Sequence, residues 1–434
     1  MKKFHLTVLC AILGAAVAMA IPAIEPLLCG FNPDPSICRA GEDYYLVTSS
    51  FSLFPGLPVY HSRNLTDWEV IGHAWTSLMG QPVPSDDDGI WAPTIRFHDG
   101  TFYISVTFRG KDGQANYILS AKNPAGPWSE PVKVDAKEGI DGSLFFDGAK
   151  AYYQSNARPK KIEWGRQCVI WAQEIDLATL RLLGERHVLT SGSGEKPVFA
   201  EGPHIYKIDG KYRLLMAQGG TGFDHAASLH VAENVFGPYE ACAGNPVLTA
   251  TDLGKASPLQ AFGHADLVDT PSNTWFAVFL ARRMLAGGTL CPLGRETFLC
   301  PVEWQTDGSA KFLREKSVKG SWRDRAGVRY SLMTHPEWNA RLQKVKSHNE
   351  TFSTGLAPGD AICIYRSTQG FYSRTNTTSR TIPASVSLSE SGVRFTLDGV
   401  TESETLPLAP LCDQPRHNRF NGLAVGTFTP YPAQ

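Results

Sequence analysis

A short motif recurs five times in the first two thirds of the chain, each time 10 or 11 residues ahead of an aromatic residue in a strand-like segment. The five motif positions are Asp34, Trp91, Asp141, Glu201 and His264. They stand 57, 50, 60 and 63 residues apart, which is close to the spacing of propeller blades. We therefore expect radial repetition around an axis, with the motif position of every copy near the centre.

Each repeat has the pattern of short strands joined by tight turns. The stretch 94–103 is the clearest case, because its Asp99-Gly100 pair is a hairpin turn signal between alternating apolar and polar residues. No window shows sustained helical periodicity with caps, and the 40 Gly and 29 Pro favour strands and turns. The chain is therefore predicted to be all-β, a five-bladed β-propeller with about four strands in each blade.

The two ends of the chain differ from the repeats. Residues 1–20 combine two lysines, an apolar run and a small-residue ending, which predicts a signal peptide cleaved after Ala20 and a secreted, extracellular protein. The apolar run is too short to predict a membrane span. We expect the propeller over residues 21–310, a charged linker over 311–330, and a small β-sandwich-like domain over 331–434.

Charge and cysteine spacing exclude two kinds of partner. The 41 Lys and Arg against 42 Asp and Glu give a net charge of -1, which argues against a polyanion such as nucleic acid. Without Cys10 of the signal, eight cysteines remain, an even number that suits an exported protein, and none has the CxxC spacing of a zinc site. No metal centre is predicted, because the aspartate run 86–88 also lacks the spacing of a calcium loop.

Six motifs, in order between residues 29 and 304, resemble those of glycoside hydrolase family 43. These motifs are Gly30-Phe31-Asn32-Pro33-Asp34-Pro35-Ser36, Gly89-Ile90-Trp91-Ala92-Pro93, Asp141-Gly142-Ser143-Leu144-Phe145-Phe146, Glu201-Gly202-Pro203-His204, Gly263-His264-Ala265-Asp266-Leu267-Val268 and Pro292-Leu293-Gly294-Arg295-Glu296-Thr297. The resemblance implies a five-bladed propeller that acts on xylan and arabinan side chains. It is greatest to the β-xylosidase-like branch, whose β-sandwich after the propeller is shortened in this chain.

The resemblance also implies roles for the three carboxylates. Asp34 corresponds to the general base that activates a water, Glu201 to the general acid, and Asp141 to a third carboxylate that positions Glu201 and keeps its pKa high. Two carboxyl groups far enough apart to admit a water give inversion of configuration. Asp34 and Asp141 also sit in turn-forming dipeptides, but three carboxylates at equivalent repeat positions favour the catalytic interpretation.

Four further residues resemble the family's sugar-binding groups. Phe51 and Trp91 correspond to aromatic walls of the first sugar site, with core packing as the alternative. Arg295 corresponds to an arginine that reaches the sugar, with an ion pair to Glu296 as the alternative. His264 is expected near the axis, where it supports the base or contacts a sugar hydroxyl. No cofactor is required, and the only metal that the resemblance allows is a structural Ca²⁺ near His264.

These observations predict a secreted, inverting glycoside hydrolase that releases terminal xylose from β-1,4-xylo-oligosaccharides during xylan breakdown. An α-L-arabinofuranosidase that removes arabinose side chains is the alternative within the class, because the same motifs serve both activities. A catalytically inactive sugar-binding propeller is the alternative from another class, although all three carboxylates are present. The expected partner is a xylo-oligosaccharide or an arabinoxylan fragment.

Overall fold

The computed structural model describes residues 24–51, 53–76, 88–284, 291 and 293–324, together with seven strands beyond them. These later strands are β24 (Arg329–Leu332), β25 (Ala361–Ser367), β26 (Gly370–Asn376), β27 (Pro383–Ser389), β28 (Gly392–Leu397), β29 (Thr401–Glu402) and β30 (Leu423–Phe428). The predicted signal peptide therefore lies outside the described residues. Among the described residues, no helix has the length and apolar character needed to cross a membrane.

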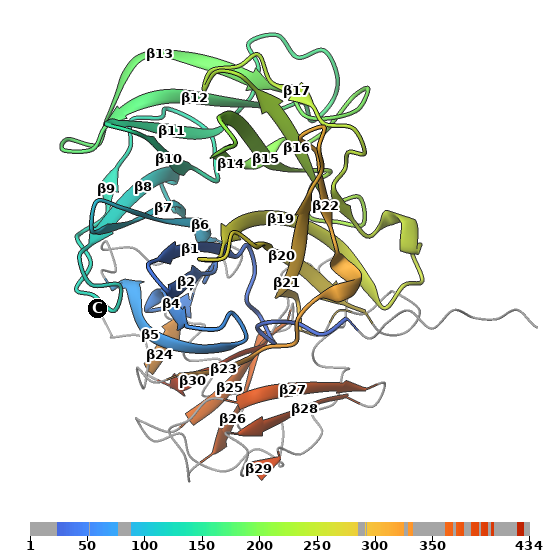
Figure 1. Ribbon diagram of the computed structural model, residues 1–434. Coiled ribbons are helices and arrows are strands. Elements are labelled where there is room, and N and C mark those ends of the chain that lie inside the picture. The colour runs from blue at the N-terminus through green and yellow to red at the C-terminus, as the bar shows by residue number, and fades with distance from the viewer. Residues whose placement is uncertain are drawn as a thin grey trace, which may run out of the picture.

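Five antiparallel sheets, each built on four consecutive main strands, are arranged around a common axis (Figure 1). In chain order they are β1 (Ser36–Ala40), β2 (Asp43–Val47), β4 (Gly56–Ser62) and β5 (Asp67–Trp75); β6 (Gly89–His98), β7 (Thr101–Gly110), β8 (Gly113–Ala121) and β9 (Val132–Lys133); β10 (Ser143–Asp147), β11 (Lys150–Ala157), β12 (Val169–Asp176) and β13 (Arg181–Thr190); β14 (Glu201–Ile208), β15 (Lys211–Gln218), β16 (Ala226–Ala232) and β17 (Glu240–Ala241); β19 (Leu259–Asp269), β20 (Trp275–Arg283), β21 (Arg295–Trp304) and β22 (Ala310–Phe312). Their innermost strands β1, β6, β10, β14 and β19 contact one another in that order, and β19 contacts β1. This confirms the predicted five-bladed propeller.

Smaller elements complete the description of the propeller. The short strand β18 (Leu248–Thr249) pairs with β16, and β3 (Leu53–Phe54) pairs with β24. The only helical elements of the described residues are two single 3₁₀ turns, η1 (Thr251–Leu253) and η2 (Arg314–Lys316).

The predicted hairpin turns form as their sequences require. At Asp99-Gly100 both residues have positive φ, 46° and 69°, and His98 pairs with Thr101 across the turn. The Asp209-Gly210 turn repeats this geometry, with φ of 52° and 77°. Two consecutive positive φ angles define the turn that matches the natural twist of paired strands, and Asp-Gly supplies them at low cost.

Apolar side chains fill the space between neighbouring blades. Trp75 of the first blade stacks on Phe108 of the second, with ring centroids 5.3 Å apart and planes 11° from parallel. Trp171 of the third blade is completely buried in the cluster that joins the second and third blades. Because each blade buries both faces against neighbours, the axis is left to the innermost strands and the side chains that they carry.

The ring is closed by the segment that precedes the first blade. The Leu27 and Leu28 N–H groups both donate to the Thr297 carbonyl of β21, at 2.8 and 3.1 Å. The Asn32 N–H donates to the Arg295 carbonyl at 3.1 Å, and the Gly30 N–H donates to the Glu296 carboxylate at 2.8 Å. These bonds hold the start of the first blade against the last one.

The segment 311–330, interpreted from its charge as a linker, contains a strand that belongs to the propeller. Strand β23 (Ser321–Asp324) pairs in parallel with the outer strand β5 of the first blade. Trp322 is buried there, meets Tyr60 edge to face at 6.0 Å, and donates its indole N–H to the Cys29 carbonyl. A single buried tryptophan marks this docking, which is why a composition-based reading of the segment missed it.

The strands after β23 form two further sheets. One has the order β26-β25-β30-β24-β3 and the other the order β27-β28-β29. The alternating stretches predicted as strands near residues 385–388 and 392–397 lie in β27 and β28. Packing of the two sheets into a β-sandwich stays a prediction.

Four cysteines of the propeller carry free thiols. They are Cys38, Cys168, Cys242 and Cys300, of which all but Cys242 are buried. The eight cysteines left after signal removal are therefore not all paired in disulfides.

Trp322→Ala tests whether β23 is part of the propeller. Truncating a buried tryptophan and orphaning its hydrogen-bond acceptor should cost about 3–5 kcal/mol of unfolding free energy. We expect a clear fall in melting temperature by calorimetry or circular dichroism. Val188→Ala is the control, because Val188 is 61% exposed and a surface truncation changes stability by about 0.5 kcal/mol or less. A Trp322→Ala protein that melts like the wild type would contradict the docking described here.

Candidate active site

Every blade carries a residue with a left-handed backbone within its innermost strand or two residues ahead of it, at or next to the repeated motif position. These residues, with φ between 42° and 57°, are Asp34, Ala92, Asp141, Gly202 and His264. In the second and fourth blades the equivalent positions are therefore Ala92 and Gly202. Each lies one residue after the position predicted from the sequence, Trp91 and Glu201. A left-handed non-glycine residue is strained, and strain of this kind gathers at functional sites.

Bulges accompany the left-handed positions in three of the innermost strands. The pairing register shifts between Trp91 and Thr94 in β6, between Glu201 and His204 in β14, and between Gly263 and Asp266 in β19. A bulge re-aims the side chains beside it. The shifts therefore account for side chains from successive positions reaching the same pocket.

One pocket of about 270 Å³ brings together all seven residues predicted from the sequence as catalytic or sugar-binding. Its lining consists of Asp34, Phe51, Trp91, Ala92, Ile140, Asp141, Phe199, Glu201, Gly220, Thr221, His264 and Arg295. The wall is mostly apolar, with a few charged groups that converge from different blades. This is the usual composition of a small-molecule site.

Asp34 is a buried carboxylate held in its ionised form. Its Oδ1 accepts a hydrogen bond from Arg295 Nη1 at 2.6 Å, and its Oδ2 accepts one from the Ser49 hydroxyl at 2.6 Å. His264 Nδ1 lies 3.7 Å from Oδ1. Burial alone would raise the pKa of Asp34, but Arg295, His264 and the Ser49 hydrogen bond together lower it below its ordinary value.

Glu201 and Asp141 have the opposite character. Burial, followed by the Asp34 charge, raises the pKa of Glu201 to about 7, although the residue keeps part of its surface open. Burial together with the charges of Glu201 and Asp34 raises the pKa of Asp141 to about 7, against the opposing effects of His264 and the Gly202 N–H. Asp141 is not among the causes that raise the pKa of Glu201, so its predicted role in keeping that pKa high stays a prediction. The two raised groups are best regarded as a coupled pair.

Arg295 connects the ionised carboxylate to the aromatic wall. Its guanidinium lies 5.4 Å from the centroid of the Phe51 ring while it bonds to Asp34. Glu296, the alternative partner considered from the sequence, pairs instead with Arg283 at 2.6 Å. Arg295 is therefore committed to the pocket.

Phe51 and Trp91 form one aromatic side of the pocket. Their ring centroids are 6.4 Å apart, and reciprocal backbone hydrogen bonds between Phe51 and Ile90 join their segments. Phe51 is only 3% exposed and Trp91 is partly exposed. Phe51 therefore fits both interpretations made from the sequence, a wall of the sugar site and a core residue, since it lines the pocket and is buried.

Two polar residues near the pocket carried no sequence signal. Ser49 accepts the Ala92 N–H at 2.7 Å while donating to Asp34, so it ties the first blade to the second. His225 bonds through Nδ1 to the Ala261 carbonyl at 3.1 Å, and burial is the main cause that lowers its pKa to about 3. Neither residue lies at a repeated motif position, which was the signal used for the others.

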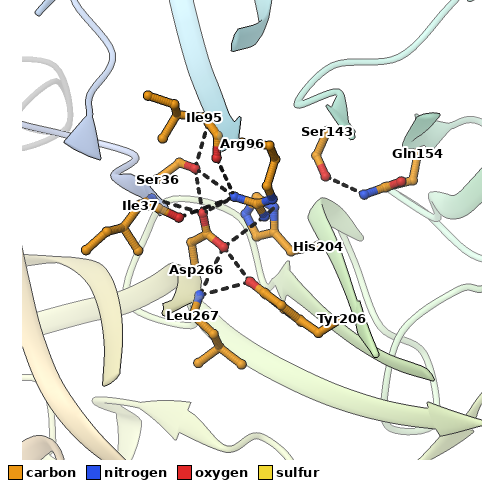
Figure 2. A network of polar contacts seen from close by, with 10 residues as sticks. All are labelled: Ser36, Ile37, Ile95, Arg96, Ser143, Gln154, His204, Tyr206, Asp266 and Leu267. Carbon is orange, nitrogen blue, oxygen red and sulfur yellow. Dashed lines mark hydrogen bonds and ion pairs between the residues drawn. The ribbon is translucent and has the colours of Figure 1, made fainter. Parts of the chain in front are cut away.

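A buried polar network joins innermost strands of the propeller (Figure 2). Its centre is Asp266 of β19, whose side chain has no exposed surface and forms an ion pair with Arg96 of β6 at 2.7 Å. The Ser36 hydroxyl of β1 donates to the same carboxylate at 2.5 Å, and so does the Tyr206 hydroxyl of β14. Arg96 Nη2 also lies 3.0 Å from His204 Nδ1. Four of the five blades therefore meet at one carboxylate.

The charges of this network are balanced within the chain. Burial would raise the pKa of Asp266, but Arg96 and then His204 hold it well below its usual range. The described residues contain no group of three or more His, Cys, Asp or Glu side chains placed to hold a metal. Calcium takes about 6–8 oxygen ligands, waters among them, and the carboxylate of Asp34, 3.7 Å from His264 Nδ1, is already bonded to Arg295 and Ser49. The Ca²⁺ ion considered near His264 stays a prediction, and it would need ligands other than a cluster of the described side chains.

The fold and pocket together define a class, a five-bladed propeller with three carboxyl groups and one arginine converging in an axial pocket. The sequence model of the family described as glycosyl hydrolases family 43 matches residues 24–310 of this chain. The chain belongs to this family.

Similar proteins carry two kinds of name. A xylosidase/arabinosidase of Butyrivibrio fibrisolvens is 44% identical over 65% of this chain and 55% of its own length. A non-reducing end alpha-L-arabinofuranosidase of Bacteroides ovatus is 41% identical over 69% of this chain and 55% of its own length. The crystal structure of a xylan beta-1,4-xylosidase from Bacillus halodurans has a TM-score of 0.68 at 27% identity, covering 93% of this chain and 96% of that one. The chain spans about half the length of the curated relatives it matches.

Asp141→Asn tests the electrostatic cost of the buried carboxyl pair. Because the folded-state pKa of about 7 exceeds the ordinary value of 3.8, the wild type should lose stability as pH rises from about 4 to about 7. Asparagine tolerates the left-handed backbone and carries no charge. We expect the variant to be more stable than the wild type at pH 8, by up to about 4 kcal/mol, and to differ little from it at pH 4.

Thermal unfolding at the two pH values measures this difference. Asp209→Asn is the matched control, because Asp209 also has a left-handed backbone but lies exposed in a hairpin turn. The control should show the same pH dependence as the wild type. An Asp141→Asn protein with unaltered pH dependence would mean that Asp141 is not a buried, repelled carboxyl group.

Proposed function

We propose that this protein is a secreted, inverting glycoside hydrolase that removes terminal xylose from β-1,4-xylo-oligosaccharides. The observation that carries the proposal is the opposite electrostatic character of two carboxyl groups in one pocket. The pKa of Asp34 is lowered, whereas the pKa of Glu201 is raised to about 7. Separation of this kind assigns a base and an acid in the same site.

The reaction needs one water and two proton transfers. Asp34 takes a proton from the water as its oxygen bonds to the anomeric carbon, and Glu201 gives its proton to the leaving oxygen as the glycosidic bond breaks. Arg295 and Ser49 fix the orientation of Asp34 through one hydrogen bond to each of its oxygens. Afterwards Asp34 is protonated and Glu201 ionised, so proton exchange with solvent restores the starting state.

Asp141 is assigned a positioning role. It accepts the N–H of Gly202, the residue after Glu201, and its charge interacts with that of Glu201. Because the two carboxyl groups repel each other when both are ionised, the pair favours a state that retains a proton near neutral pH. This supports protonation of the acid in the resting enzyme.

The dimensions of the pocket favour the end of a chain. A volume of about 270 Å³ lies just below the roughly 300–1,000 Å³ of sites for drug-sized ligands, so it encloses the one reacting sugar ring. The leaving group then lies outside it, at the partly exposed edge that carries Phe199 and Glu201. The relative named alpha-L-arabinofuranosidase supports arabinose release as the second candidate. Secretion rests on the signal pattern of residues 1–20.

Proton NMR of early hydrolysis tests the stereochemistry and the sugar together. With a β-xyloside, an inverting enzyme should release α-xylose first, because a single displacement reverses the anomeric centre. Parallel reactions with aryl β-xyloside and aryl α-L-arabinofuranoside identify the preferred sugar. Early release of β-xylose would refute inversion, and a higher kcat/KM on the arabinofuranoside would favour the second candidate.

The identity of the acid is tested by varying the leaving group. Glu201→Gln should lose about 10²–10⁴-fold in rate on xylobiose, whose leaving oxygen needs a proton, and much less on a dinitrophenyl xyloside. Asp34→Asn is the comparison variant, and it should be nearly inactive on both substrates because the water still needs a base. Equal losses of Glu201→Gln on the two substrates would remove Glu201 as the acid.

A further inference from the structure

Phe199 is a pocket residue that no repeated motif marks, and its backbone is strained. Its φ is 52°, in the left-handed region that a bulky aromatic residue rarely adopts. Arg166, in the connection between β11 and β12, is also left-handed with φ of 63°. The Phe199 N–H donates to the Arg166 carbonyl at 3.0 Å, so the two strained residues hold each other in place.

The Phe199 ring is fixed on two sides. The Arg166 guanidinium lies 5.5 Å from the ring centroid, within the range of a cation–π contact. Gly220 lies against the ring so closely that a Cβ there would come within 2.8 Å of Phe199 Cδ2. Gly220 has a φ of 71° and also lines the pocket. Strained backbone, a charged contact and a required glycine together orient one partly exposed ring toward the pocket.

The ring belongs to the side of the pocket that carries the acid. Phe199 precedes Glu201 by two residues in the segment that enters β14, and both line the pocket. The other aromatic side, Phe51 and Trp91, is joined through Arg295 to Asp34. In an inverting reaction the acid faces the departing oxygen, while the base faces the opposite side of the reacting sugar.

We propose that Phe199, braced by Arg166 and Gly220, is the stacking surface for the first sugar of the leaving group, and so selects disaccharides and longer chains. The inference rests on the proposed function, because it takes Glu201 as the acid. The contact between Phe199 and the leaving sugar helps to position the bond that breaks. Loss of this contact should therefore lower kcat/KM for oligosaccharides. A glycosyl fluoride has no leaving ring and makes little use of this contact.

The test compares Phe199→Ala on xylobiose and on xylosyl fluoride, or on the corresponding arabinosides if arabinose is the preferred sugar. We expect kcat/KM on the disaccharide to fall about 10- to 100-fold, and the loss on the fluoride to be about tenfold smaller. Arg166→Met, which keeps the length but removes the charge, should give a smaller loss of about 2- to 5-fold in the same direction. Phe199→Tyr should retain most of the wild-type ratio between the two substrates.

Two controls separate this role from a general structural one. Phe97→Ala removes an exposed phenylalanine that does not line the pocket, and should leave the substrate ratio unchanged. Phe199→Leu keeps an apolar side chain against Gly220 and replaces Phe199→Ala if the latter does not fold. Equal losses of kcat/KM on the disaccharide and the fluoride, in Phe199→Ala or Phe199→Leu, would overturn the inference. They would mean that the ring contacts the reacting sugar or only supports Glu201.

A binding measurement keeps this inference distinct from the proposed function. In an Asp34→Asn background, calorimetry should show that Phe199→Ala weakens xylobiose binding about 10-fold or more and xylose binding far less. Unchanged disaccharide binding would overturn the role of Phe199 even in an active enzyme. A wild type that binds both sugars but hydrolyses no glycoside would refute the proposed function, while the binding ratio still decides the role of the ring.

Discussion

The buried carboxylate of Asp266 is the interaction on which the arrangement of the blades depends. Its partners Ser36, Arg96 and Tyr206 come from three other innermost strands. Leaving a buried ion-pair partner uncompensated costs about 3–5 kcal/mol, so a shift of register in any one blade is opposed. Asp34 and His264 stand two residues before Ser36 and Asp266, so the network holds the strands that carry two of the pocket's side chains.

The groups next to Asp34 and Asp141, rather than burial alone, determine whether the pKa of each carboxyl group is lowered or raised. Asp34 and Asp141 are both nearly inaccessible to solvent, yet their pKa values shift in opposite directions. The difference arises because Arg295 and Ser49 bond directly to Asp34, whereas Asp141 adjoins the like charge of Glu201. Arg295, which belongs to the last blade of the ring, is the largest of the influences that lower the pKa of Asp34.

Site residues at repeated positions of the blades could be predicted from the sequence. Residues placed by contacts between distant parts of the chain could not. Asp34, Asp141 and Glu201 were found because each lies near the same position of a blade. The one-residue offset at Glu201 was missed, since a bulge in β14 has no signature in the spacing. Arg96 and Asp266 are 170 residues apart, and Phe199 owes its place to a strained contact with Arg166, so neither arrangement could be inferred from local patterns.

The propeller extends to strand β23 in the structure, which lies beyond the end of the family match in the sequence. The family match ends at residue 310, but the chain returns to the first blade at β23, where Trp322 covers Tyr60. Evolutionary exchange of C-terminal domains among relatives would therefore have to keep this strand with the propeller. A recombination joint placed before it would strip the outer edge of the first blade, whereas one placed after residue 324 would leave the whole ring intact.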